Sequence, residues 1–243
     1  MIKDVIIRKA LSAFFLLIAG LIFTECVKDE PHSLGNLRNH FFTAYLRTQT
    51  IRISSPKDQT VKFYFLGRSI TSYSSNSEFE ELANFYGDIN YNGPVFDVTG
   101  PCEIIDGALS GMKVRTISDF DNEHPAGSDV SDITECAFCS YKPFFENGYK
   151  LPDNFYTNTD YDLNEGLFGT ILKYKVTEIN RQNTIFSDPE EWRLMFTKQP
   201  ARAGEYEFIL TVDGDYGTMN GVFTIDFSSP SEEHNRKFNL INK

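Results

Sequence analysis

Two short acidic stretches hold the residues best suited to bind a metal ion. Residues 160–166 place oxygen ligands at alternate positions of a loop, which can wrap around a hard cation such as calcium. They depart from an EF-hand, because Gly166 falls at the seventh place and Ile171 stands where the closing glutamate belongs. Residues 119–123 form a second, evenly spaced acidic loop. Both stretches consist of turn formers that water can solvate, so we expect no metal and no other cofactor at either.

Cys136 and Cys139 have the spacing of a redox pair. The tryptophan before the motif and the proline inside it are missing, and no βαβ pattern surrounds it. A zinc site of this type needs a second cysteine pair, which the sequence does not contain. In an oxidising compartment, the three thiols of Cys102, Cys136 and Cys139 allow one structural disulfide of undetermined pairing, or remain as inert buried thiols.

Signatures of catalysis are absent from the sequence. The four histidines lie far apart and do not form a zinc-hydrolase motif. They are His32, His40, His124 and His234. Residues 107–111 resemble a nucleophile elbow, but Ser110 stands at the fourth place rather than the third. No phosphate-binding glycine loop is found. We therefore expect no catalytic residue and no enzyme, with a hydrolase based on two facing carboxylates as the less favoured alternative.

The segment over residues 141–161 contains seven aromatic residues, interspersed with Asn, Asp and Gly. They are Tyr141, Phe144, Phe145, Tyr149, Phe155, Tyr156 and Tyr161. Sugars stack on aromatic rings, so the segment could bind a glycan, with Asn and Asp contacting the hydroxyls. A long irregular loop also needs aromatic anchors to hold it on a β-sandwich, and Trp192 lies elsewhere. We favour packing and keep a glycan-binding accessory protein as the alternative function.

The N-terminus predicts export and lipidation. Lys3, Arg8 and Lys9 precede a mostly apolar run of about 14 residues, which ends just before Cys26. The run is shorter than the roughly 20 residues that span a bilayer, and fits the apolar region of a signal peptide. It lacks the small residues of an ordinary cleavage site, whereas a cysteine at its end is typical of a bacterial lipoprotein. We predict a signal peptide over residues 1–25 and a lipid on Cys26.

Residues 26–35 have no periodic apolar pattern and predict a flexible tether. Lys28, Asp29 and Glu30 are similar to the acidic surface-export signals of Bacteroidota lipoproteins, and a solvated linker explains them equally well. Removing residues 1–25 changes the formal net charge from −11 to −12. This charge disfavours nucleic acid as a partner. We expect a non-enzymatic binding or structural component of the cell envelope, of unknown biochemical role. Its lipid would hold it at the outer membrane, facing the periplasm or the cell surface, and a glycan or a protein is its candidate ligand.

Alternating or β-rich segments predict a mainly β domain. They are residues 61–65, 112–117, 171–179, 192–197, 205–212 and 221–227. Residues 213–217 form a turn-rich connection that predicts a hairpin between the last two. Gly67 is expected to close the first. We predict one domain over residues 36–243, an antiparallel Ig-like β-sandwich with one or two short helices.

One helix is well marked. Ser77 and Glu80 form a capping box, and Gly87 supplies the stop. Between them the apolar residues Phe79, Leu82, Ala83 and Tyr86 share one helical face. A second helical turn is expected over residues 188–191, where Asp188 caps and Pro189 takes the first position.

Residues 113–133 resemble a segment of uncharacterised Bacteroidota lipoproteins. In those proteins a strand leads into an acidic loop with a His-Pro-Ala-Gly-Ser-like run, here beginning at His124, and then into an Asp-rich turn. Residues 205–227 are similar to their closing strands. The resemblance covers about a fifth of the chain. It implies a location in the cell envelope and no particular activity.

Overall fold

The computed structural model describes residues 39–92, 102–150 and 170–228, which belong to one compact unit. The strands in these ranges are β1 (Ala44–Ile53), β2 (Thr60–Thr71), β3 (Glu103–Ile105), β4 (Leu109–Thr116), β5 (Thr134–Ser140), β6 (Thr170–Lys175), β7 (Ser187–Phe196), β8 (Glu205–Gly214) and β9 (Gly217–Asp226). The α-helices are α2 (Asn76–Tyr86), α3 (Lys142–Glu146) and α4 (Arg181–Thr184). Single 3-10 turns, η1 (Ser131–Ile133) and η2 (Val176–Glu178), precede β5 and follow β6.

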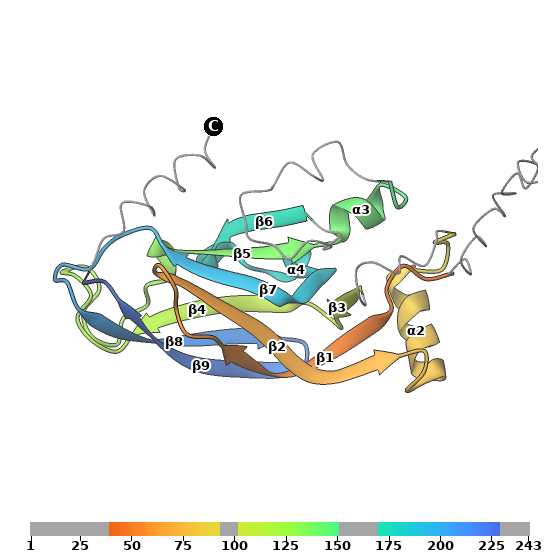
Figure 1. Ribbon diagram of the computed structural model, residues 1–243, viewed down its shortest axis with the longest axis horizontal. Helices are drawn as coiled ribbons and strands as arrows, with labels where there is room; N and C mark the ends of the chain where they lie inside the picture. Colours follow the sequence, from red (N-terminus) through yellow and green to blue (C-terminus); the bar gives the residue numbers. More distant parts are fainter. Residues whose placement is uncertain (1–38, 93–101, 151–169, 229–243) are drawn as a thin grey trace, which may run out of the picture. The chain divides into compact units, whose positions relative to one another are not determined.

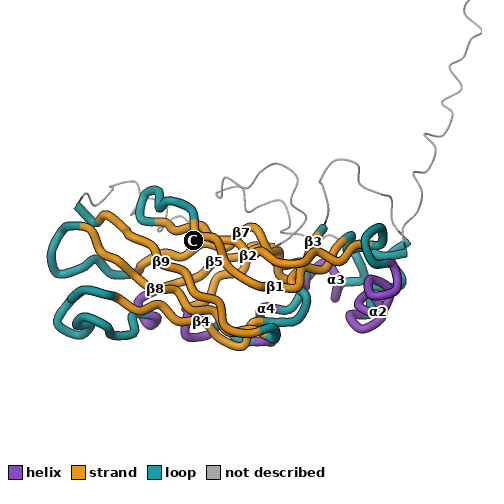
Figure 2. Tube along the Cα trace, turned by 90° about the horizontal axis from the view of Figure 1, so that it is seen from below, coloured by secondary structure: helices purple, strands orange, loops and turns teal. Residues whose placement is uncertain are grey.

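The strands form two sheets that pack against each other (Figure 1). The larger sheet has the order β3-β1-β2-β7-β5-β6, and the smaller has the order β4-β8-β9. Helices α2 and α3 lie at one end of the sandwich in both views (Figure 2). The prediction of a mainly β sandwich with short helices is confirmed. The short pair β1–β3 is parallel, unlike its antiparallel neighbours, and there are three α-helices in the described ranges instead of one or two.

The space between the sheets is filled by the inward side chains of both. Phe138 and Trp192 are cross-strand partners on β5 and β7, and their rings stack at 4.2 Å. Phe208 of the smaller sheet belongs to the same buried cluster as these two rings. Burial of such large rings is the main favourable term in folding, because each removes much apolar surface from water. The sole tryptophan is thus a core residue.

A second buried cluster, mainly aromatic, joins the helices to the larger sheet. Strand alternation divides β1 between the two clusters, since Leu46 belongs to the first and Tyr45 to the second. Phe79 and Tyr86 of α2 and Phe144 of α3 pack into this second cluster. The helices are therefore held by aromatic burial at one end of the sandwich, where the candidate site lies.

The hairpin prediction is confirmed, and some predicted boundaries are wrong. Strands β8 and β9 pair without interruption across a two-residue turn. Gly67 does not close its strand. It lies inside β2 beside a bulge in β1, where a Cβ would stand 2.0 Å from the carbonyl oxygen of Arg47. The strand predicted over residues 171–179 ends at Lys175, because the Lys175 N–H donates to the Glu178 carboxylate and a 3-10 turn follows.

The predicted helical turn over residues 188–191 is also wrong, because these residues belong to β7. Asp188 does accept a hydrogen bond from the N–H of Glu190, at 2.7 Å, as a cap would. The hydroxyl of Tyr141, 47 residues away in sequence, donates to the Asp188 carboxylate at 2.7 Å. Within β7, the indole of Trp192 donates to the Asp188 carbonyl at 2.7 Å. The buried tertiary contact with Tyr141 thus overrides the local helical propensity.

Candidate functional site

Helix α2 positions two side chains of the candidate site. It begins at Asn76, one position before the predicted capping Ser77, and Ser75 takes the N-cap position without a side-chain cap bond. Gly87 ends it in the left-handed conformation, at φ 75°, as predicted. The predicted apolar face is confirmed, since Phe79, Ala83 and Tyr86 are buried. That face fixes the helix on the larger sheet, and Glu78 and Tyr86 then meet residues from four other segments.

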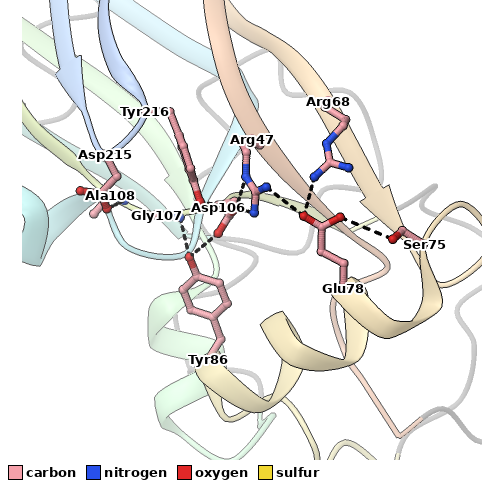
Figure 3. Close-up of polar contacts among 10 residues, drawn as sticks. All are labelled: Arg47, Arg68, Ser75, Glu78, Tyr86, Asp106, Gly107, Ala108, Asp215 and Tyr216. Atoms are coloured by element: carbon pink, nitrogen blue, oxygen red, sulfur yellow. Dashed lines mark hydrogen bonds and ion pairs between the residues drawn. The ribbon is translucent and has the colours of Figure 1, made fainter.

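We call the resulting group the α2 cluster (Figure 3). It consists of Arg47, Arg68, Glu78, Tyr86, Asp106 and Tyr216. Arg47 on β1 connects the two carboxylates of the cluster. Its guanidinium donates to Glu78 Oε1 at 2.8 Å, and to Asp106 Oδ2 at 3.1 Å and 2.9 Å. Arg68 on β2 binds the same Glu78 oxygen, and this bond holds the pKa of Glu78 below its usual range.

Asp106 is the buried centre of the α2 cluster, with a side chain only 3% exposed. Besides Arg47, it accepts hydrogen bonds from the hydroxyls of Tyr86, at 3.1 Å, and Tyr216, at 2.5 Å. The Tyr86 oxygen accepts in turn from the N–H of Gly107. Burial raises the pKa of both tyrosines, and the Asp106 charge raises them further. Both hydroxyls therefore stay protonated and keep donating at neutral pH.

Tyr216 connects the α2 cluster to the smaller sheet. It stands in the turn between β8 and β9, and the Arg47 guanidinium lies 5.0 Å from the centre of its ring. The neighbouring Asp215 accepts from the N–H of Ala108 at 3.1 Å. Gly107 makes this approach possible, because it has φ +90° and its Cβ would lie 2.8 Å from Asp215 Oδ2. The turn and the β3–β4 connection are thus joined side by side.

The chemistry that the α2 cluster can perform is limited by its own bonds. Each of its carboxylates already accepts hydrogen bonds from arginine or tyrosine donors. A general base needs a lone pair directed at a substrate proton, and these lone pairs are directed at donors inside the protein. The cluster is therefore suited to fixing the geometry of a surface. The exposed rings of Phe85, 80% exposed, and Tyr216, 45% exposed, adjoin its Tyr86 and Asp106.

The acidic loop over residues 119–123 forms hydrogen bonds with its own backbone and with nearby side chains. Asp121 Oδ1 accepts from the N–H groups of Glu123 and His124 and from His124 Nδ1, each at 2.8 Å. The other ring nitrogen of His124 lies 3.2 Å from Asp132, and Glu123 pairs with Lys198 at 3.0 Å. The ligand atoms of Asp121, Glu123 and His124 lie within 4.8 Å of one another. Hydrogen bonds within the protein occupy these groups and account for their proximity. Residues 160–166 lie outside the described ranges.

No disulfide joins Cys102, Cys136 and Cys139 in the structure; Cys136 and Cys139 are buried, and Cys102 is partly buried. Cys136 and Cys139 stand three residues apart on β5, where side chains alternate between faces, so they point to opposite sides of the sheet. Burial in the sandwich core raises the pKa of the Cys136 thiol far above its usual value. This geometry does not fit a redox pair.

Four of the seven aromatic residues proposed as a glycan platform are described. Tyr141 and Phe144 are buried in the second cluster, and Phe145 and Tyr149 pack against it. The Tyr149 hydroxyl also donates to the buried Asp88 at 2.9 Å. For these four residues packing is the better interpretation. Phe155, Tyr156 and Tyr161 lie outside the described ranges.

Sequence reasoning missed the residues that form the α2 cluster. Arg47 and Asp106 are 59 residues apart, and neither belongs to a recognisable motif. The available signal was weak: residues 44–53 are rich in Thr and Ile, which favour a strand. Cys26, the site residue predicted from the sequence, lies outside the described ranges, as does His32. No helix in the described part of the chain is long and apolar enough to cross a membrane.

Comparison of the chain with protein-family models, with curated proteins and with solved structures finds no match. The class that the fold defines is a two-sheet β-sandwich with short helices at one end. Its candidate site is a network of arginine, carboxylate and tyrosine groups beside exposed aromatic rings. Functional inference therefore rests on the sequence and on this geometry.

We predict that Asp106→Asn lowers the free energy of unfolding by about 2–3 kcal/mol, because it leaves Arg47 and one tyrosine hydroxyl without their buried acceptor. Denaturant titration of the two proteins measures the change. Asp213→Asn is the matched control, since Asp213 accepts only the Thr218 hydroxyl on a partly exposed strand and an amide oxygen can replace it. Equal stability of wild type and Asp106→Asn would show that the cluster does not hold the fold.

Proposed function

We propose that this chain is an exported, lipid-anchored protein of the outer membrane, whose β-sandwich is a non-enzymatic binding component of the cell envelope. The observation that carries the anchoring is the order of a basic start, a short apolar run and Cys26. The resemblance of residues 113–133 to Bacteroidota lipoproteins supports the same location. Residues 26–35 would then serve as the tether between the lipid and the folded domain.

A binding role is supported by the state of the polar groups at the α2 end. The carboxylates of the α2 cluster are used internally, which disfavours proton transfer to a substrate. Phe85 and Tyr216 remain exposed beside a rigid network, and rigid exposed aromatic rings are typical of binding surfaces. Rigidity lowers the entropy lost on binding. The ligand would therefore contact these rings.

A glycan is the ligand that the exposed rings favour. The Tyr216 ring is fixed by its hydroxyl bond to Asp106 and by the Arg47 guanidinium, so one aromatic surface is held in place. The apolar face of a sugar can stack on such a ring. This assignment places the glycan site at the α2 cluster, not at residues 141–161.

The anchor is tested by growing cells with a clickable fatty acid. We expect the label on the wild-type protein and its complete loss in Cys26→Ala, because only the thiol at the end of the signal peptide receives the lipid. Cys102→Ala is the matched control and should be labelled like the wild type. A labelled Cys26→Ala protein, or an unlabelled wild type, would refute the anchoring.

The ligand class is tested by measuring binding of the protein to an array of bacterial and host polysaccharides. We expect saturable binding that weakens by about tenfold or more in Tyr216→Ala, the equivalent of about 1.4 kcal/mol. The control is Tyr73→Ala, which removes a ring that is 99% exposed in the turn before α2. If no polysaccharide binds the wild type, or both variants bind equally well, the glycan assignment is wrong.

A further inference from the structure

The outer edge of β9 is a row of backbone groups that no described residue binds. Gly214 and Gly217 flank the two-residue turn of the β8–β9 hairpin, and residues that flank such a turn form a hydrogen-bonded pair. The odd-numbered residues of β9 therefore pair with β8. The N–H and C=O groups of the even-numbered residues point away from the sheet. These residues are Thr218, Asn220, Val222, Thr224 and Asp226.

The outermost strands of the two sheets other than β9 are protected in the described part of the chain. Strand β4 has a bulge between Leu109 and Gly111, and its outer groups are bonded by residues 128–131, as in the 2.8 Å bond from Val130 N–H to the Val114 oxygen. Strand β3 has three residues. Strand β6 has six, including two lysines. Short strands, bulges, lysines and covering segments are the usual protections against edge-to-edge pairing.

Among the described residues, strand β9 has none of these protections. It is ten residues long, pairs with β8 in an unbroken register and contains neither proline nor lysine (Figure 1). Its inner face is closed by the core, since Gly221 lies against Ile51 and Ile53 of β1. Its outer face carries Val222, which is 57% exposed beside its cross-strand partner Ile209. Both the edge and this apolar pair are thus available to another strand.

We propose that β9 pairs with β9 of a second copy of this chain, antiparallel and about a two-fold axis at Val222. This register matches even-numbered residues with even-numbered residues, so the outward N–H and C=O groups of both edges meet. Val222 then faces Val222 of the other copy, and the two Ile209–Val222 pairs form one apolar row across the four central strands of a six-stranded sheet. The pairing of the two β9 strands requires neither the lipid nor the glycan.

The side chains of β9 are complementary to themselves in this register. Asn220 faces Thr224, and Thr218 faces Asp226, so hydrogen-bonding groups meet on both sides of the axis. No two like charges are opposed between the copies, a condition that many edge strands do not meet. Within one copy, Asp226 faces Glu205 across the hairpin and accepts a hydrogen bond from the N–H of Ser228, and this register brings no further acid next to it. These features favour a second copy over an unrelated strand.

The pairing is tested by cross-linking the full-length chain in cells that export it, with a short bifunctional thiol reagent. Val222→Cys should shift to twice the monomer mass, because the two thiols meet at the axis. Co-expressed Asn220→Cys and Thr224→Cys chains should also cross-link to each other, which fixes the register. Ser110→Cys, on an exposed position of β4, is the matched control and should remain monomeric. The wild type gives the background from the native cysteines.

Val222→Lys separates the pairing from the fold. Introduced into the Asn220→Cys and Thr224→Cys chains, it should abolish their cross-link, since two lysines would meet at the axis, while Val222→Thr should keep it. The melting temperature of each variant checks that the domain is folded. Equal cross-linking of Val222→Cys and Ser110→Cys, or an adduct of Val222→Cys with another protein in place of a second copy, would overturn the proposal.

Discussion

A single buried carboxylate, Asp106, holds together the end of the sandwich where helix and sheets meet. A buried charge is tolerated only where donors surround it, so Asp106 requires Arg47, Tyr86 and Tyr216 to come to it. Those three residues belong to β1, α2 and the β8–β9 turn. One set of charge-assisted hydrogen bonds thus connects the helix, which aromatic burial holds on the larger sheet, to the turn of the smaller sheet.

The sequence predicted the elements whose pattern is local. Alternation with period two identified β4 and β6, although the predicted strand ran past the end of β6, and the spacing of Phe79, Ala83 and Tyr86 identified the buried face of α2. Strand β1 was missed because its bulge at Thr48 and Thr50 shifts the alternation partway along the strand.

The α2 cluster and the extended form of Asp188 could not be predicted, because both depend on partners distant in sequence. Local periodicity carries no information about such pairs. The same limit applies to the partners of the acidic loop over residues 119–123, which local spacing does not identify. The hydrogen bonds of the described loop are made to His124, Lys198 and its own backbone.

The central claim is that Asp106 unites the helix and the smaller sheet through one acceptor. A double-mutant cycle with Tyr86→Phe and Tyr216→Phe tests it most directly, because each change removes one hydroxyl from a different element. Denaturant titration of the four proteins gives the coupling energy. We predict a coupling of about 0.5–3 kcal/mol, as found for residues that share a network. Strictly additive effects would contradict the account, since the two tyrosines would then act independently.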